Sequence, residues 1–441
     1  MSTHNLSRDH FPNDFKWGVA TSSFQIEGAH DSDGKGPSIW DTFCDIDGKI
    51  ADASNGHVAC EHYRRWPQDV ELIHGLGVNA YRFSISWPRV QPDGQGPWNE
   101  AGFAFYDQLI AALEQRGIEV HLTLNHWDLP QALQDLGGWA NRDLCGHFTR
   151  YATEVARRFG HRLQSICTHN EPWVIAILGY EQGIFAPGIQ SRSQAMQAVH
   201  HLLLSHGMAL QAMRGLGVKA AMGIVLNLSP IYPASDDPKD LAKAHLDDGL
   251  ILRWYMDALY KGSYPQDVID HLGEDAPHVM PGDLNTIAQV NDFLGVNYYT
   301  RNFSSSGNPW DVASTGNEVT DMGWEVYPQG LTELLCRLHA DYQPQRLWVT
   351  ENGAAFKDQW VDGVVADPQR LAYIRDHIAA THAALKQGVP VGAYFAWSLM
   401  DNFEWASGYA KRFGLVHVDF ETQKRTLKQS ALWYRNFLSG Q

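Results

Sequence analysis

A short apolar run followed by a helical pattern recurs eight times along this chain of 441 residues. The runs are prone to form strands, and several segments between them place apolar residues at i, i+3 and i+4, as amphipathic helices do. Eight strands alternating with helices predict an α/β fold with a parallel sheet, and the count favours a closed (β/α)8 TIM barrel over an open sheet. The predicted strands are 17–22, 80–86, 120–124, 165–168, 221–226, 293–296, 347–350 and 392–398. The clearest predicted helices are 102–115, 142–159, 193–214 and 368–387.

No low-complexity tract, block of like charges or long Gly/Ser linker divides the chain. Residues 1–441 are therefore expected to form a single (β/α)8 domain, because α/β barrels often exceed the usual length of one domain. The extra length is expected in extended loops after the strands, such as 31–55 and 301–324.

Composition and charge restrict the location and the partners that we expect. The formal net charge of −16 argues against nucleic acid and against anionic membrane surfaces, since both attract basic patches. No apolar stretch approaches the roughly 18 residues of a spanning helix, and the N-terminal residues lack the apolar core of a signal peptide. The five cysteines are scattered and odd in number, which fits reduced thiols better than a disulfide framework. We expect a cytoplasmic protein, monomeric or homo-oligomeric, whose partner is a small molecule.

Hydrogen-bonding and aromatic side chains stand at the ends of the predicted strands. In a (β/α)8 barrel the carboxyl ends of all strands open onto one face, where catalytic residues gather. Groups from distant parts of the chain are thus expected to converge on one pocket suited to a sugar. These residues are Gln25, Arg82, His126, Trp127, Asn170, Glu171, Asn227, Asn297, Tyr299, Glu351 and Trp397.

Glu171 and Glu351 each end a buried-strand pattern, and each has an asparagine beside it. A buried carboxylate is costly unless a neighbour pairs with it or a reaction uses it. Each glutamate could instead cap the following helix, since Glu171 and Pro172 resemble a helix start. Capping favours Asp, Ser or Thr, however. Two such strand ends indicate a pair of acids that face each other across a substrate, as glycosidic bond hydrolysis requires.

Arg82 is a cation within an apolar strand and needs a buried partner, whether its role is structural or catalytic. Beside Glu351 it would lower the pKa of that carboxyl group and keep it ionised. Tyr299 could donate a hydrogen bond to the same group, or it could simply pack in the barrel.

Two indole rings and a carboxylate lie close together near the C-terminus, at Trp397, Glu404 and Trp405. An indole ring can stack on the C–H face of a pyranose, while a carboxylate accepts hydrogen bonds from paired hydroxyls. We therefore expect these residues to bind a sugar.

The histidines could suggest a metal site, but no HExxH or similar compact ligand spacing is present. His200, His201 and His206 fall on an amphipathic helix, where packing and surface roles are expected. Phosphate-binding glycine motifs are absent as well. The sequence therefore predicts no metal and no cofactor.

The chain resembles family 1 of the glycoside hydrolases, the β-glucosidase family. The resemblance extends from 15–28 to 413–419 and includes the motifs at 81–88, 168–172, 297–299, 350–353 and 401–405. It implies a retaining, exo-acting β-glucosidase that releases terminal non-reducing β-D-glucose from β-glucosides and short cello-oligosaccharides through a glycosyl-enzyme intermediate.

The resemblance also implies a role for each matching residue. Glu171 would be the acid/base and Glu351 the nucleophile, while Arg82, Asn297 and Tyr299 would orient and tune Glu351. The residues expected to hold the terminal sugar are Gln25, His126, Asn170, Trp397, Glu404 and Trp405, and those expected on the aglycone side are Trp173 and Trp324.

Two branches of the family fit less well. The 6-phospho-glycosidases replace the Glu–Trp pair with small residues, whereas Glu404 and Trp405 are present here, and the Glu404 carboxylate would repel a phosphate. The thioglucosidases lack the acid/base that Glu171 supplies. A broad β-glycosidase that acts mainly as a β-galactosidase or β-fucosidase, a transglycosidase, and a non-catalytic sugar-binding protein remain as alternatives.

Overall fold

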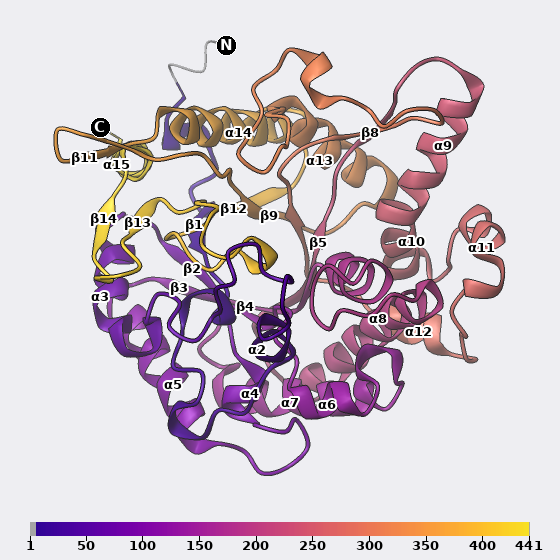
Figure 1. Ribbon diagram of the computed structural model, residues 1–441, viewed down its shortest axis with the longest axis horizontal. Helices are drawn as coiled ribbons and strands as arrows, with labels where there is room; N and C mark the ends of the chain where they lie inside the picture. The colour runs from indigo at the N-terminus through magenta and orange to yellow at the C-terminus, as the bar shows by residue number, and fades with distance from the viewer. Residues whose placement is uncertain (1–5, 441) are drawn as a thin grey trace.

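The eight predicted strands close into one parallel barrel in the computed structural model, which describes residues 6–440 (Figure 1). The barrel strands follow one another around the barrel in chain order, and β12 pairs with β1 to close it, with Lys16 opposite Ala393. The predicted (β/α)8 fold is therefore confirmed. The barrel strands are β1 (Lys16–Ala20), β2 (Ala80–Ser84), β3 (Glu119–Asn125), β4 (Ser165–Asn170), β5 (Ala221–Asn227), β7 (Phe293–Asn297), β9 (Leu347–Asn352) and β12 (Val391–Trp397).

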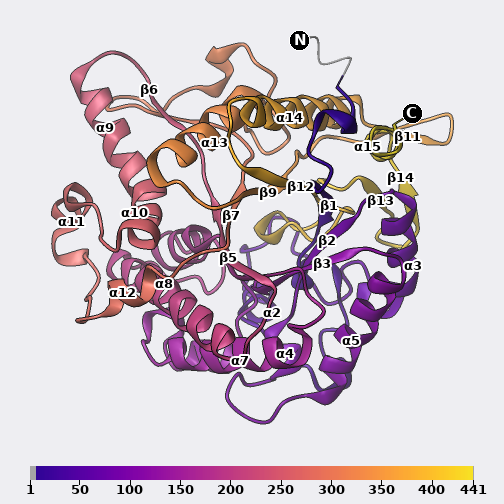
Figure 2. The same cartoon turned by 180° about the vertical axis from the view of Figure 1, so that it is seen from behind.

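Helices surround the barrel on all sides, as Figure 1 and the reverse view in Figure 2 show. The four predicted helices are present as α5, α7, α8 and α14, with ends within two residues of the prediction. The helices are α1 (Ser23–Ile26), α2 (Ile39–Cys44), α3 (His62–Gly75), α4 (Trp87–Val90), α5 (Glu100–Gln115), α6 (Gln131–Asp135), α7 (Leu144–Phe159), α8 (Arg192–Gly215), α9 (Pro238–Asp248), α10 (Trp254–Lys261), α11 (Gln266–Leu272), α12 (Asp283–Ile287), α13 (Pro328–Tyr342), α14 (Pro368–Lys386) and α15 (Gln429–Ser439).

The barrel interior is filled by side chains. The rings of Phe293 and Trp348 stack at a centroid distance of 4.1 Å, and Phe395 lies beside them in the same buried cluster. Gly18 makes room for Phe395, because a Cβ atom there would lie 2.3 Å from its ring. The interior is thus a packed core rather than an open channel.

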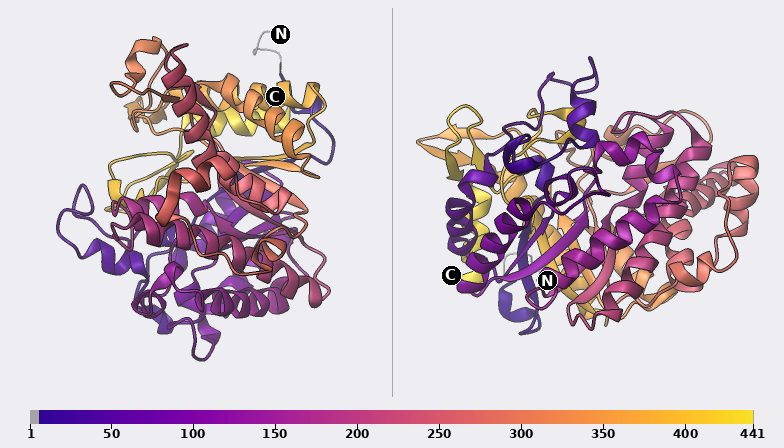
Figure 3. Two further views of the ribbon diagram at one scale, coloured as in Figure 1. Left: turned by 90° about the vertical axis from the view of Figure 1, so that its right-hand side faces the viewer. Right: turned by 90° about the horizontal axis from the view of Figure 1, so that it is seen from below.

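The loops after the strands carry the extra length. Segment 31–55 contains α2, and segment 301–324 contains the short strand β8 (Asn302–Ser304), which pairs with β6 (Ile231–Pro233). The longest connection, 228–292, holds α9 to α12, which the sequence analysis left unassigned. Figure 3 shows α9 and its neighbours projecting from the barrel. Two further hairpins, β10 (Gln359–Val361) with β11 (Val364–Ala366) and β13 (Val416–Val418) with β14 (Arg425–Leu427), follow β9 and β12.

The two ends of the described chain pack together. Phe11 lies 5.2 Å from the ring of His382 in α14 and 6.5 Å from Phe437 in α15, measured between ring centroids. Figure 1 shows the two ends of the coloured chain on the side of the molecule where α14 and α15 lie. The terminal helix therefore completes the outer layer of the barrel.

The structure corrects one expectation and agrees with another. His200, His201 and His206 of α8 are all buried, so none is a surface residue; each pairs with a polar group in the core, for example His200 Nε2 with the acceptor Asp283 Oδ2 and His206 Nδ1 with the Thr168 hydroxyl. All five cysteines are free thiols.

Within residues 6–440, no helix combines the length and the apolar character that crossing a membrane requires.

Candidate active site

A cavity of about 280 Å³ lies at the carboxyl ends of the barrel strands. Residues from six strands, or from the loops directly after them, line it, and both predicted catalytic glutamates are among them. Gln25, Arg82 and Asn170 are buried and do not line the cavity. The predicted site residues that line it are His126, Trp127, Glu171, Trp173, Asn227, Asn297, Tyr299, Trp324, Glu351, Trp397, Glu404 and Trp405.

Glu351, near the end of β9, receives two short hydrogen bonds. Arg82 in β2 donates from Nη1 to Oε1 at 2.6 Å, and the Tyr299 hydroxyl donates to Oε2 at 2.6 Å. The side chains of Arg82 and Glu351 are each 3% exposed, so solvent ions screen this ion pair little. Both donors stabilise the ionised form of Glu351.

Glu171, directly after β4, has a neutral donor instead. The Asn297 amide donates from Nδ2 to Glu171 Oε1 at 2.5 Å, and Thr350 fixes that amide by donating to its Oδ1 at 2.8 Å. The prediction placed Asn297 beside Glu351, and its amide acts against the rise that burial causes in the pKa of Glu351. Its carboxyl hydrogen bond, however, goes to Glu171.

These surroundings separate the two carboxyl groups in acidity. Burial, followed by the nearby charge of Glu351, raises the pKa of Glu171 to about 8. Burial also raises the pKa of Glu351, but Arg82 and Tyr299 act against that rise. Because a cation contacts only one member of the pair, Glu351 ionises first and Glu171 keeps its proton at neutral pH.

Asn170 links the two glutamates and sets the tautomer of His126. Its Oδ1 accepts from Arg82 Nη2 at 2.7 Å and from Asn297 Nδ2 at 3.1 Å, so its Nδ2 faces His126 Nε2 at 3.2 Å. His126 Nε2 must accept that hydrogen bond, which places the proton on Nδ1. Burial and the charge of Arg82 hold the pKa of His126 well below its ordinary value. His126 is thus neutral, and its Nδ1–H has no partner within the described part of the chain.

Gln25 supports Glu404 from outside the cavity. Its Nε2 donates to Asn402 Oδ1 and to the Phe403 carbonyl oxygen at 2.9 Å each, and reaches Glu404 Oε2 at 3.4 Å. Ser22 donates to Gln25 Oε1 at 2.6 Å, so the amide orientation is set. Gln25 therefore positions the loop that carries Glu404; a direct contact between Gln25 and a sugar stays a prediction.

Three residues around the cavity have left-handed backbone conformations. The φ angles are 79° for Trp127, 52° for Glu171 and 49° for Trp405. A non-glycine residue in this region costs on the order of 1–3 kcal/mol and persists only where the surrounding structure enforces it. Such strain is typical of functional sites, and here it turns three side chains at the strand ends toward one space.

Packing between neighbouring strands explains why Asn352 and Gly353 follow Glu351 at the end of β9. Asn352 donates to the Tyr298 carbonyl oxygen at 2.7 Å and accepts from the Tyr394 hydroxyl at 2.7 Å, which joins β9 to its neighbours. At Gly353 a Cβ atom would lie 1.7 Å from the Trp397 carbonyl oxygen. Only glycine allows the end of β9 to lie this close to the end of β12.

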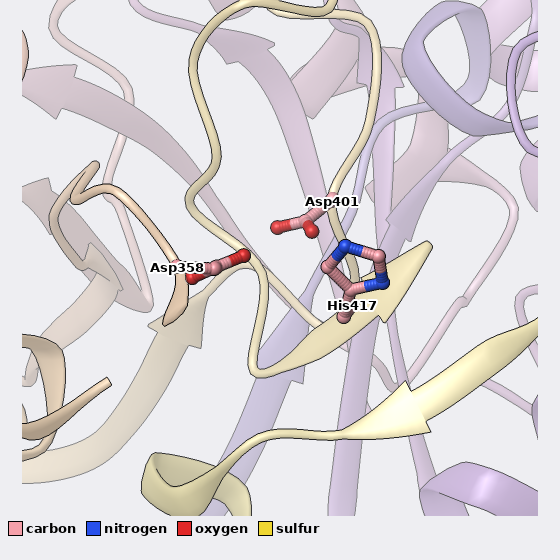
Figure 4. A group of neighbouring side chains, drawn as sticks. All are labelled: Asp358, Asp401 and His417. Atoms are coloured by element: carbon pink, nitrogen blue, oxygen red, sulfur yellow. The ribbon is translucent and has the colours of Figure 1, made fainter. Parts of the chain in front are cut away.

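Asp358, Asp401 and His417 approach one another outside the cavity (Figure 4), in an arrangement that could hold a cation. The carboxylates already have cationic partners, however. Lys428 Nζ lies 2.7 Å from Asp401 Oδ1 and 2.8 Å from Asp358 Oδ2, and Arg412 donates to Asp401 at 2.6 Å. The group is therefore a buried ion-pair network that anchors the start of the loop carrying Glu404.

Many of the residues that line the cavity are apolar. Trp173 and Trp324 line the cavity, and their place on the aglycone side stays a prediction. The sequence did not point to the other apolar lining residues. Apolar residues in loops resemble core residues in a sequence; only Val174 and Leu178 could have been suspected, from their place after Trp173 on the π-helical segment η5 (Val174–Glu181). The additional apolar lining residues are Val174, Leu178, Phe185, Leu228, Met322 and Phe413.

Glycoside hydrolases use a pair of carboxyl groups, one proton-bearing and one ionised, on either side of the bond that they cleave. This (β/α)8 barrel has such a pair in one cavity at its strand ends, which places the protein in that class. Within this class, the chain belongs to glycosyl hydrolase family 1, whose family model matches residues 7–441.

Named relatives agree with this assignment. The chain is 44% identical to beta-glucosidase A of Acetivibrio thermocellus, over 99% of each chain, and 43% identical to beta-glucosidase A of Thermotoga maritima, over 98% of each chain. Among solved structures, a family 1 beta-glucosidase from Exiguobacterium antarcticum B7 matches with a TM-score of 0.95 and 42% identity, over 99% of each chain.

Proposed function

We propose that this protein is a retaining, exo-acting β-glucosidase that releases terminal non-reducing β-D-glucose from β-glucosides and short cello-oligosaccharides. The observation that carries the proposal is the unequal pair of acids: Glu351 bound by Arg82 and Tyr299, and Glu171 bound only by a neutral amide. The names of the relatives support glucose as the sugar.

In the first step, the Glu351 carboxylate attacks the anomeric carbon while Glu171 gives its proton to the leaving oxygen. The glycosidic C–O bond breaks, and an ester between the sugar and Glu351 forms. That ester removes the negative charge beside Glu171, so the pKa of Glu171 falls. In the second step, Glu171 takes a proton from water, whose oxygen attacks the anomeric carbon and releases Glu351 as a carboxylate.

Cleavage at a chain end is supported by the burial around the cavity. His126, Trp397 and Trp405 are at most 4% exposed, whereas Trp173 and Trp324 are half-buried. A cavity with a buried polar part and a more open apolar part admits the terminal sugar and leaves the rest of the substrate outside. His126 Nδ1–H and the Glu404 carboxyl group, whose pKa burial and the charge of Glu351 raise to about 8, are groups that sugar hydroxyls can pair with.

The nucleophile is tested with Glu351→Gly. Turnover should be abolished, because no other carboxylate with a cationic partner lines the cavity among residues 6–440. Azide should partly restore turnover on an activated glycoside by entering the vacated space. The azide product should have the α configuration. A near-normal rate without azide would contradict the assignment.

The acid is tested with Glu171→Ala. The rate should fall about 10²–10⁴-fold on cellobiose, a substrate with a poor leaving group, and much less on 2,4-dinitrophenyl β-glucoside, which needs no proton to leave. Equal losses on both substrates would contradict the acid role. The ratios of kcat/KM for nitrophenyl glucoside, galactoside and fucoside, with NMR of the first product anomer, test the sugar and the retention of configuration.

A further inference from the structure

A small cavity lies inside the barrel, next to Arg82, and we call it the inner cavity. Its volume is about 10 Å³, and its lining residues come from β2 to β5, β7, β9 and β12. Each of these residues is at most 5% exposed, so the barrel encloses the cavity. This volume is about the smallest that holds one water molecule.

Two buried polar groups in the wall of the inner cavity lack a partner. Arg82 donates from Nη1 to Glu351 and from Nη2 to Asn170, but its Nε–H makes no hydrogen bond within residues 6–440. The hydroxyl of Thr123, in β3, is also without a partner in the described chain. Arg82 and Thr123 are at most 2% exposed. Buried polar groups in native proteins are nearly always satisfied, and ordered water satisfies those that the protein does not.

A water molecule between these two groups would satisfy both. Arg82 Nε can only donate, so its partner must be an acceptor, and a water oxygen accepts while its hydrogens donate. One hydrogen can go to Thr123 Oγ1. The hydroxyls of Ser165 and Thr350 also line the cavity; each already has one partner and keeps a lone pair that can accept the other hydrogen.

An ion fits the inner cavity less well than water does. The Arg82 guanidinium lines the cavity and repels a cation at this short range. An anion such as chloride is larger than a water molecule, and the cavity has room for a water molecule at most. A neutral ligand of that size that both donates and accepts hydrogen bonds is water.

We infer that the inner cavity binds one ordered water molecule that bridges Arg82 Nε and the Thr123 hydroxyl. Thr123 is then a positioning residue. It holds the water, the water fixes the plane of the guanidinium, and the guanidinium contacts Glu351 Oε1 at 2.6 Å. Support of this kind from behind a contact is what keeps a reactive group in its productive geometry. The kinetic consequence rests on the proposed function, in which Glu351 is the nucleophile.

A high-resolution crystal structure of the wild-type protein tests the site itself. Electron density for one water should lie about 2.7–3.2 Å from both Arg82 Nε and Thr123 Oγ1. Density for no water in the cavity, or an Arg82 Nε that bonds directly to a protein group, would overturn the inference. This test needs no activity.

The positioning role is tested with Thr123→Val, which keeps the shape of the side chain but removes the hydroxyl. With Arg82 less firmly held, the ionised form of Glu351 is less stabilised, so its pKa should rise. The acidic limb of the pH profile of kcat/KM on 4-nitrophenyl β-glucoside should move up by about half to one pH unit. That is a three- to tenfold loss below the midpoint, with a smaller change at neutral pH.

The same groups face Glu351 in the variant and in the wild type, so the shift reports on Arg82. The titratable or charged side chains around Glu351 are Arg82, Cys167, Glu171, Tyr299 and Glu404.

Thr123→Ser restores a hydroxyl and should keep the wild-type profile. Thr381→Val makes the same change at another buried threonine, whose hydroxyl donates to the His377 carbonyl oxygen within α14, and should leave the acidic limb in place. An acidic limb that does not move in Thr123→Val, or that moves equally in Thr381→Val, would contradict the positioning role. A wild-type protein that hydrolyses no β-glucoside would contradict the proposed function instead, and the crystal structure alone would then decide on the water.

Discussion

At the scale of single residues, the candidate site depends on the different partners of two like side chains. Glu171 and Glu351 share one cavity, but a guanidinium and a phenol contact Glu351 whereas an amide contacts Glu171. The sequence predicts the identity of both acids and of Arg82, because each ends or interrupts an apolar strand. It does not predict that Asn297 bonds to Glu171, since the amide orientation depends on Thr350 from another strand.

The pH dependence of activity should follow the proton on Glu171. With its pKa raised to about 8, kcat/KM should fall as the pH rises above 8, because the leaving oxygen then receives no proton. Glu351→Gln removes the neighbouring negative charge and should lower the pKa of Glu171, measured by carbon-13 NMR titration of its carboxyl group. Glu421→Gln, at an exposed position, is the control. An unchanged Glu171 pKa in Glu351→Gln would contradict the coupling.

At the scale of elements, the strand ends approach one another so closely that some positions accept no side chain. The end of β9 meets the end of β12 at Gly353, where a Cβ atom would lie 1.7 Å from a backbone oxygen that cannot move aside easily. The motif around Glu351 thus meets two requirements: Glu351 supplies a carboxyl group, and Gly353 leaves room for the end of β12. The sequence shows the glycine, but only the packed barrel shows what it avoids.

Gly353→Ala should destabilise the protein by about 1–3 kcal/mol or more, as overpacking of a rigid site does. It should also lower kcat, because Glu351 would be displaced with the strand end. Gly146→Ala in α7 is the matched control: no atom lies within 4 Å of the added Cβ, and the change should stabilise by up to ~1 kcal/mol. Urea unfolding of both variants, with kinetics, checks this; equal stabilities would refute the steric reason.

At the scale of the whole molecule, a buried network connects the C-terminal region to the active-site loop. Lys428, just before α15, pairs with Asp401 at the start of the segment that carries Glu404 and Trp405. Burial acts to raise the pKa of Asp401, but Lys428 and Arg412 outweigh it and hold that pKa below its ordinary value. The ionised Asp401 thus stabilises the fold at pH values above the ordinary pKa of a carboxyl group. This stabilisation is lost as the pH falls through the lowered pKa of Asp401.

Lys428→Met should destabilise the protein by about 3–5 kcal/mol at neutral pH, because it leaves a buried carboxylate without its main partner. The deficit should shrink at acidic pH, where Asp401 in the variant takes up a proton. Lys386→Met, at the exposed end of α14, should have little effect. Thermal unfolding at several pH values checks both; a deficit that does not change with pH would contradict the electrostatic explanation.

The sequence alone determined the eight strands and the closed barrel, and it singled out the two glutamates of the candidate site, because strand periodicity and a carboxylate in an apolar run are local signals. The tertiary structure decided the rest. It placed Gln25 and Asn170 behind the cavity wall, buried the three histidines of α8, and directed the Asn297 amide to Glu171. Those outcomes depend on contacts between segments far apart in the chain, and no local pattern specifies which distant groups meet.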